Sequence, residues 1–500
     1  MGDSWLYVLM PARFARNCDP NDPKSNTQPY AHPTTLNQRY GAGADPRKLA
    51  AFRETQRVIA DALAGALPGQ AAPLAADDAN LRAFRRRILV GGPEHNGGCS
   101  IGAYLPSARG TGGQWDNARF AANLAARADY QFVQSSYDEK YNFTTQPLPP
   151  ITPAPAWTAF LAARAARVAS LTPAAPDTSA AAGWAPIANA AAPQKCGRLT
   201  LALNATDGAI ASLVDAATGH EWVNGDRFLG FTYRTYAEAD FNSFNAEYTP
   251  SCGVPCENFA KVGMDSAAPA SREWAPALVR AWARAAPAAG CALLLQLALP
   301  ADTVAKYGGA AAIYVALDVD AGAAGAPPTV SAAFSLLNKT ATRLAESAWV
   351  SFPAAVALTP ASAAARGAAE SGAAPAAWWL DVIGEPVDPL DVVPFGTRHL
   401  HAVGRGFGFG GGAPRGGAAV ARARAAAPSA PAVAEFTVET LDAALVAPGD
   451  RAHLLHYDGD ALPDMSGGMH VSLFNNLWGT TFAQWWGGDV SFRFVVTLSV

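Results

Sequence analysis

Glu94 and His95 stand side by side in "GGPEHNGG", residues 91–98, directly after the helix-like run "LRAFRRRILV". Gly and Asn favour a loop, and an imidazole in a loop either faces water or lies close to a bound ligand. A histidine ring can coordinate zinc or bond to a sugar hydroxyl. Because a catalytic zinc site usually takes three protein ligands, this pair would need partners elsewhere in the chain.

A second group with suitable chemistry lies in residues 475–486, "NNLWGTTFAQWW". Amides pair with sugar hydroxyls both as donors and as acceptors, and indole rings stack on the apolar face of a pyranose. The alternative is a buried turn whose tryptophans belong to the core. We predict substrate-binding roles for Asn475, Asn476, Trp478, Thr480 and Trp485.

Two further histidines alternate in "RHLHAV", residues 398–403. If this run is a strand, His399 and His401 lie on the same face of it. They would then form either a metal-binding pair or, more commonly, a polar strand face. We assign His401 to substrate binding.

The elements that must position these residues change character along the chain. Residues 1–195 are biased toward helix, and 500 residues favour two or three domains. Asp45 and Pro46 have the residue types of an N-cap and a first helical position, and the apolar residues that follow predict a helix with one buried face. We also predict helix over residues 114–143 and 156–171.

After about residue 196 the sequence reads as short strands separated by Gly, Pro and Asp turns. Alternation of apolar and polar residues is clear over 199–203, 311–321, 329–337, 436–448 and 490–500. Many short strands of this kind are typical of a β-sandwich.

Composition limits the function. The formal net charge of −4 argues against a nucleic-acid partner, and no apolar run is long enough for a membrane span. Six cysteines permit disulfides without requiring them, and Cys252 and Cys256 have a turn-like spacing. Three N-glycosylation sequons, at Asn142, Asn204 and Asn338, mildly favour a secretory route, although no signal peptide is recognisable.

Several stretches, in order, resemble the glycoside hydrolase family 38-like proteins, relatives of the α-mannosidases, in a branch of unassigned activity. They include "GDSW" at 2–5, "PEHNGG" at 93–98, "SSYDEKY" at 135–141, "GTRHLHAV" at 396–403 and "GMHVSLFNNLWGTTFAQWW" at 468–486. The last of these is the most specific, because so dense a cluster of Asn, Trp, Gly and Thr is improbable by chance.

The resemblance implies a multidomain α+β protein. Its parts would be the remnant of an α/β-barrel catalytic domain with a helical bundle, followed by a large antiparallel β-sandwich region. We place the C-terminal part of the catalytic α/β domain with its helices at 1–150, a Pro/Ala-rich helical connector at 151–195, and the β-sandwich region at 196–500.

The resemblance also implies zinc-assisted, retaining hydrolysis of an α-linked glycan or glycoside. Asp3 matches the family's acid/base position and His95 a zinc-ligand position, and we assign Trp5 and Glu94 to substrate binding. The family's His-x-Asp zinc pair and its nucleophilic Asp lie upstream of the Gly2–Trp5 match. We therefore expect both to be absent, and this chain alone to be inactive. The alternative is a non-catalytic carbohydrate-binding or scaffold protein.

Overall fold

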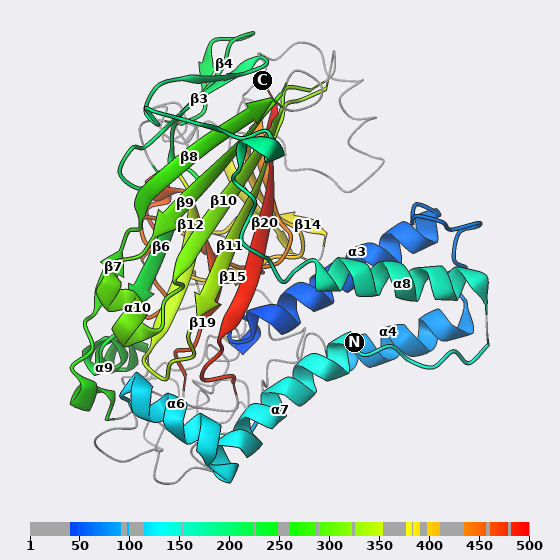
Figure 1. The fold of residues 1–500 in the computed structure, drawn as a ribbon, viewed down its shortest axis with the longest axis vertical. Coiled ribbons are helices and arrows are strands. Elements are labelled where there is room, and N and C mark those ends of the chain that lie inside the picture. The colour runs from blue at the N-terminus through cyan, green and yellow to red at the C-terminus, as the bar shows by residue number, and fades with distance from the viewer. Residues whose placement is uncertain are drawn as a thin grey trace.

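The computed structural model describes residues 41–91, 98–99, 115–152, 154–223, 227–248, 261, 263–285, 290–322, 326–353, 377–382, 384–390, 398–410, 435–456, 461–478 and 482–499. Helices come first along the described chain and strands dominate after them (Figure 1). The first helices are α3 (Pro46–Ala64), α4 (Ala79–Gly91), α6 (Asn117–Ala126), α7 (Ala128–Thr145) and α8 (Pro155–Ala169).

The capping signal that predicted the first helix is confirmed. Asp45 Oδ1 accepts the backbone N–H of Lys48 at 3.1 Å, and Pro46 occupies the first turn. The helix ends at Gly65, whose φ of 72° is left-handed and suits a residue without a Cβ. By contrast, the predicted helix over 114–143 is two helices, α6 and α7. The chain is extended at Arg127, which both ends α6 and starts α7.

Among the described residues, ten strands form the largest sheet, and every neighbouring pair in it is antiparallel. In spatial order they are β1 (Ala185–Pro186), β8 (Ala277–Ala285), β9 (Cys291–Ala298), β10 (Ala312–Asp320), β11 (Thr329–Lys339), β20 (Gly488–Ser499), β17 (Glu435–Thr440), β16 (Gly406–Gly410), β13 (Ala377–Val382) and β14 (Glu385–Val387).

Six described strands form a second antiparallel sheet. Its order is β15 (His401–Ala402), β18 (Leu445–Pro448), β19 (Met469–Asn475), β12 (Glu346–Phe352), β6 (Gly230–Thr235) and β7 (Arg272–Trp274). Two short helices, α9 (Glu238–Tyr248) and α10 (Ala301–Tyr307), lie near the β7 edge (Figure 1).

The two large sheets share one apolar core. Phe352 of the six-stranded sheet lies 5.4 Å, between ring centroids, from both Phe407 and Phe494 of the ten-stranded sheet. Phe231 and Phe334 pair in the same way at 6.4 Å. The apolar positions of the alternating strands therefore face inward from both sheets, which is β-sandwich packing. The coarse prediction, helices followed by large antiparallel sheets, is confirmed; the remnant of an α/β barrel stays a prediction.

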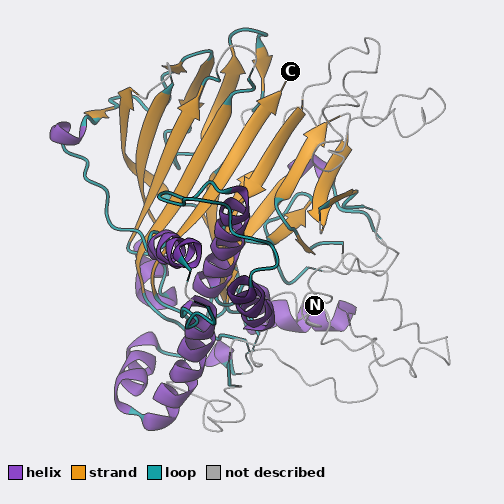
Figure 2. Ribbon diagram, turned by 90° about the vertical axis from the view of Figure 1, so that its right-hand side faces the viewer, coloured by secondary structure: helices purple, strands orange, loops and turns teal. Residues whose placement is uncertain are grey.

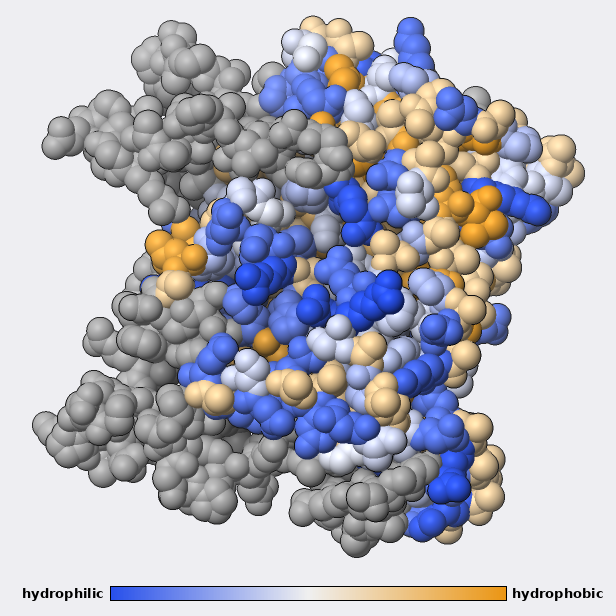
Figure 3. All heavy atoms as spheres, turned by 90° about the vertical axis from the view of Figure 1, so that its left-hand side faces the viewer, coloured by the Kyte–Doolittle hydropathy of each residue, from blue (hydrophilic) through white to orange (hydrophobic). Residues whose placement is uncertain are grey.

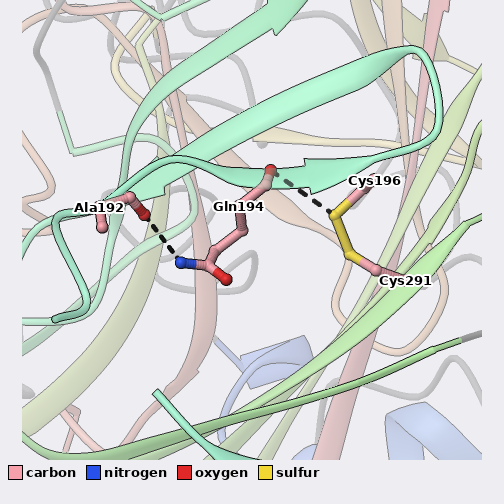
Figure 4. The surroundings of a disulfide bond; sticks show 4 residues. All are labelled: Ala192, Gln194, Cys196 and Cys291. Atoms are coloured by element: carbon pink, nitrogen blue, oxygen red, sulfur yellow. Dashed lines mark hydrogen bonds between the residues drawn. A yellow bond between two sulfur atoms is a disulfide. The ribbon is translucent and has the colours of Figure 1, made fainter. Parts of the chain in front are cut away.

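A third, four-stranded sheet is linked covalently to the sandwich. It comprises β2 (Gln194–Cys196), β3 (Leu199–Leu203), β4 (Ile210–Asp215) and β5 (His220–Glu221). Cys196 at the end of β2 forms a disulfide with Cys291 at the start of β9, with the two Cα atoms 5.0 Å apart (Figure 4). Cys252 and Cys256, which the sequence marked as a possible local pair, lie outside the described residues.

The helices gather along one part of the large sheet (Figure 2). Hydrogen bonds and ion pairs of charged side chains hold α3 there. Arg53 donates to the backbone oxygens of Leu441 and Val403, each at 3.1 Å. Glu54 is paired with Arg493 of β20 at 2.7 Å and also with Arg57. Burial by itself would raise the pKa of Glu54, but Arg57 and Arg493 outweigh it and lower that pKa to about 2.

The polar character of the surface and the character of the helices both bear on possible partners. From the side on which β7, α9 and α10 lie, hydrophilic side chains gather across the middle of the surface (Figure 3). Within the described ranges, none of the helices combines the length and the apolar character that a membrane crossing requires.

Candidate functional site

A small pocket opens at one end of the six-stranded sheet, with a volume of about 190 Å³. We call it the histidine pocket, after three of the side chains that line it. Its lining residues are His399, Pro448, Asp450, Arg451, His453, His456, Leu462, Pro463 and Asp464.

Three separate stretches of chain supply this lining. β18 ends at Pro448, and the chain that leaves it carries the Asp450–His456 stretch. Asp464 caps a single 3-10 turn, Met465–Gly467, by accepting the backbone N–H of Ser466 at 3.0 Å. His399 precedes β15, the edge strand that pairs with β18. The antiparallel pairing of β15, β18 and β19 thus brings all three stretches to the same end of the sheet.

The histidines form the inner part of the pocket and the charged residues its rim. His399 is 3% exposed, and its ring centroid lies 6.4 Å from that of His456. His456 lies the same distance from His453. Asp450 and Arg451 are exposed at the rim and lie within 3.4 Å of each other.

His453 is an uncharged imidazole at neutral pH. Burial, with Arg234, His456 and Arg451 nearby, lowers the pKa of His453 to about 3. A neutral imidazole has one donor and one acceptor nitrogen, and this ring also packs against Tyr236, at 5.4 Å between centroids. The pocket therefore offers the neutral imidazole of His453, and an ion pair with apolar Leu462 and Pro463 at its opening.

The described part of the pocket does not form a metal site. Among the described side chains, no group of three or more His, Cys, Asp or Glu residues is arranged to hold a metal ion. His456, Tyr457 and Asp458 have the His-x-Asp spacing, but they follow the Gly2–Trp5 match, whereas the family's zinc pair precedes it. Asp458 lies outside the described residues.

The pair His399 and His401 is separated by the structure. The predicted shared strand face is wrong, because β15 begins at His401 and His399 lies before it. The lining of the histidine pocket includes His399 and not His401. His401 is half-buried, and its Nε2 lies 3.0 Å from the backbone oxygen of Arg398. The substrate-binding role of His401 stays a prediction.

Four of the five predicted sugar-binding residues of 475–486 lie in the protein interior. Asn475, Asn476, Trp478 and Trp485 are each no more than 2% exposed. Trp485 stands among aromatic rings of the helical region, 5.0 Å from Phe120 between centroids, and its Nε1 donates to Gln134 at 2.7 Å. The structure thus gives these residues packing roles, and their binding roles stay predictions.

Asn476 has internal partners for both ends of its amide. Its Oδ1 accepts the backbone N–H of Glu346 at 2.8 Å, and its Nδ2 donates to the backbone oxygens of Thr342 and Leu344, each at 3.0 Å. These bonds tie the chain beyond β19 to the chain that leads into β12.

Behind Asn476 lies a buried ionic pair. Lys339 Nζ is 2.6 Å from Glu346 Oε1, and both side chains are fully buried. The Tyr233 hydroxyl donates to the other carboxylate oxygen, and the Lys339 ammonium lies 4.9 Å from the centre of the Trp486 ring. Burial raises the pKa of Glu346 and lowers that of Lys339. We call Tyr233, Lys339, Glu346 and Asn476 the buried polar network.

Asp3, Trp5, Glu94, His95 and Thr480 lie outside the described residues, so the acid/base, zinc-ligand and substrate roles assigned to them stay predictions. The sequence analysis missed Asp450, His453, His456 and Asp464. Their one available signal was the density of His and Asp in "GDRAHLLHYDGDALPD", residues 449–464.

Comparison with known proteins gives one family and distant structural likenesses. The model of the family described as "Domain of unknown function (DUF5054)" matches residues 42–325, which is more than half of the chain. No curated protein matches this chain.

Two solved structures illustrate the likenesses. An alpha-mannosidase from Enterococcus faecalis V583 is 10% identical with a TM-score of 0.29, and the match covers 63% of this chain and 30% of that one. A galactose mutarotase-like protein from Lactobacillus casei ATCC 334 is 10% identical with a TM-score of 0.25, covering 63% of this chain and all of that one. This chain therefore spans less than a third of the mannosidase. Both likenesses are too distant to carry a functional argument.

Proposed function

This chain belongs to the DUF5054 family, and we propose that its histidine pocket binds a single sugar residue of a glycan. The observation that carries the proposal is the pocket's composition within about 190 Å³. The neutral His453 imidazole can donate to one sugar hydroxyl and accept from another, a carboxylate can accept from hydroxyls, and Leu462 and Pro463 offer apolar surface. Drug-sized ligands take roughly 300–1,000 Å³, so the volume suits one small polar ring.

The catalytic form of this proposal is that the chain contributes to zinc-assisted, retaining hydrolysis of α-mannosides. Its support is the resemblance of "GDSW" and "PEHNGG", which gives Asp3 the acid/base role and His95 a place among the zinc ligands. Asp3 would protonate the leaving oxygen and then take a proton from water. When bound, zinc would supply positive charge close to the sugar hydroxyls. In this form the helical region is the remnant of an α/β-barrel domain.

The second candidate is carbohydrate binding without catalysis. Both rim carboxylates of the pocket already have partners within the protein, and this favours binding without catalysis. Asp450 is already paired with Arg451, and Asp464 caps the turn at Ser466. Carboxylates engaged in this way can accept hydroxyl hydrogen bonds, but neither is placed as a free acid in an apolar setting, which is what raises the pKa of a catalytic acid.

Titration calorimetry with methyl α-mannoside, alongside methyl glycosides of other sugars, tests the shared proposal. We expect at least one glycoside to bind, and His453→Gln and Asp450→Asn each to weaken that binding about tenfold, which is about 1.4 kcal/mol. His220→Gln is the matched control, because His220 lies in β5 of the four-stranded sheet and outside the pocket lining, and it should bind like the unsubstituted protein. Absence of binding to every glycoside, or unchanged binding in both pocket variants, would overturn the proposal.

Hydrolysis of 4-nitrophenyl α-mannoside separates the two forms. The catalytic form predicts turnover that a zinc chelator abolishes and Asp3→Asn reduces by orders of magnitude. The binding form predicts glycoside retention that survives both treatments, with no turnover in any sample.

A further inference from the structure

The three N-glycosylation sequons fall in three different structural settings. They are Asn142-Phe143-Thr144, Asn204-Ala205-Thr206 and Asn338-Lys339-Thr340. A glycan can be attached where the acceptor Asn and the hydroxyl residue two positions later are both accessible in a turn or loop. The structure therefore distinguishes among sequons that the sequence treats alike.

Asn204 begins the turn that joins β3 to β4. Its Oδ1 accepts the backbone N–H of Thr206 at 2.8 Å, which is an Asx turn. This bond holds the Asn side chain beside the hydroxyl residue of its own sequon. Ala205 and Thr206 are exposed at the tip of the turn, and Asn204 is half-buried.

Asn338 stands where β11 ends, in an exposed position. Its φ is 54°, a left-handed conformation that Asn tolerates better than most residues. The backbone N–H of Asn338 donates to Asp489 Oδ1 of the neighbouring strand β20 at 2.6 Å, and the pairing of β11 with β20 is irregular between Leu336 and Lys339. Asn338 and Thr340 are both exposed at this end of β11. Lys339 between them points inward to Glu346.

Asn142 lies inside the last turns of the 18-residue helix α7. Asn142 itself is exposed, but Thr144 is fully buried and its hydroxyl donates to the backbone oxygen of Lys140 at 3.2 Å. The helix also fixes the backbone of this sequon in hydrogen bonds. The hydroxyl that a glycosylating enzyme must reach is therefore inside the protein.

An independent feature bears on the compartment. Cys196 and Cys291 form a disulfide, and disulfides form and persist in oxidising compartments. Cys196 belongs to the same four-stranded sheet as the Asn204 turn. We propose that this chain is N-glycosylated at Asn204 and Asn338, and not at Asn142, in an oxidising secretory compartment. The proposal does not depend on the proposed sugar binding.

The reaction is glycosyl transfer from a lipid-linked diphosphate sugar donor. A bond forms between the side-chain amide nitrogen of Asn and the anomeric carbon of the donor sugar. The bond from that carbon to the diphosphate oxygen breaks, so the lipid diphosphate leaves with the electron pair. The amide nitrogen loses one proton to a base of the transferring enzyme, and no oxidant or reductant is needed.

The test is to express the full chain behind an appended signal sequence in a eukaryotic secretory host, and to measure site occupancy by peptide mass spectrometry after enzymatic release of glycans. We expect most molecules to be modified at Asn204 and at Asn338, and fewer than one in ten at Asn142. Thr206→Ala and Thr340→Ala should each remove one glycan. Thr206→Ser and Thr340→Ser, which keep the hydroxyl, should retain it and control for loss of folding.

Occupancy of Asn142 equal to that of the other two sites would overturn the structural ranking. Secretion of the folded chain with neither Asn204 nor Asn338 modified would overturn the proposal as a whole. Mass spectrometry of the same sample before and after reduction shows whether the Cys196 and Cys291 peptides are linked by the disulfide. The linked form is expected if the chain folded in an oxidising compartment.

Discussion

The histidine pocket and the asparagine–tryptophan segment, Asn475–Trp486, contain the same kind of chemistry in opposite surroundings. Both have side chains able to bind a sugar. Asn476 and Trp485 use their polar atoms on Glu346, Thr342 and Gln134 inside the protein. His453 and Asp450 line a hollow that opens to solvent. The difference teaches that residue type indicates possible chemistry, whereas the presence of a hollow decides whether a ligand can use it.

The comparison extends to charge. Burial places the Lys339–Glu346 pair entirely among protein groups, next to the ring of Trp486. The Asp450–Arg451 pair at the pocket rim is more than half exposed on both side chains. A pair of the first kind is costly to break, and one of the second kind contributes little to stability. Substitutions in the two regions should therefore separate stability from binding.

Breaking the buried pair should have the largest effect. Lys339→Met leaves the Glu346 carboxylate buried without its cation, and we expect the free energy of unfolding to fall by about 4 kcal/mol. Urea unfolding followed by tryptophan fluorescence measures this loss. The double variant Lys339→Met/Glu346→Leu should recover most of it, because no charge then remains buried. A loss below about 1 kcal/mol in the single variant would contradict the role of the pair.

Removing Trp485 should have the next largest effect. Trp485→Ala leaves a cavity beside Phe120 and Tyr137, and we expect a loss of about 3 kcal/mol. Trp485→Phe keeps the aromatic contacts but loses the bond to Gln134, and should cost about 1 kcal/mol. If instead Trp485→Ala left stability unchanged and abolished glycoside binding, the segment would be a binding site and the contrast with the pocket would fail.

Acid should lower the free energy of unfolding through the buried histidine His470. His470 is buried between Ser351 and the backbone oxygen of Gly449, and burial lowers its pKa to about 4. The unfolded chain, with a histidine pKa near 6.5, therefore takes up the proton first. Stability from this group is complete above about pH 6.5 and is lost as the pH falls toward 4, by about 3 kcal/mol.

The matched variant for this pH effect is His470→Gln, which does not titrate. Its free energy of unfolding, measured by urea titration at several pH values, should fall less steeply between pH 6.5 and 4 than that of the unsubstituted protein. Identical slopes for the two proteins would show that His470 does not contribute.

The pocket rim should show the smallest effect on stability. Asp450→Asn removes one partner of an exposed ion pair, and we expect the free energy of unfolding to change by less than about 0.5 kcal/mol. The same variant should weaken glycoside binding. Measuring both its free energy of unfolding and its glycoside affinity therefore shows directly whether the pocket serves binding and not stability. A large loss of stability would place Asp450 among the structural residues instead.

Local patterns predicted much of the fold. The alternation over 311–321 and 329–337 became the adjacent strands β10 and β11, and Asp45 and Pro46 start α3 as expected. The alternating run 436–448 was less simple. It divides between β17 in one sheet and β18 in the other, with a turn at which the Thr440 hydroxyl donates to the backbone oxygen of Ala443.

The sequence by itself determined which segments are helices or strands and which of their faces are apolar, because capping and periodicity act between residues close along the chain. Only the tertiary structure decided which polar side chains face a hollow. His399, Asp450 and Asp464 meet because β15, β18 and β19 pair at one sheet end, whereas Asn476 and Trp485 are covered by packing against residues more than a hundred positions away. Contacts over such separations depend on how sheets and helices assemble, which no local pattern encodes.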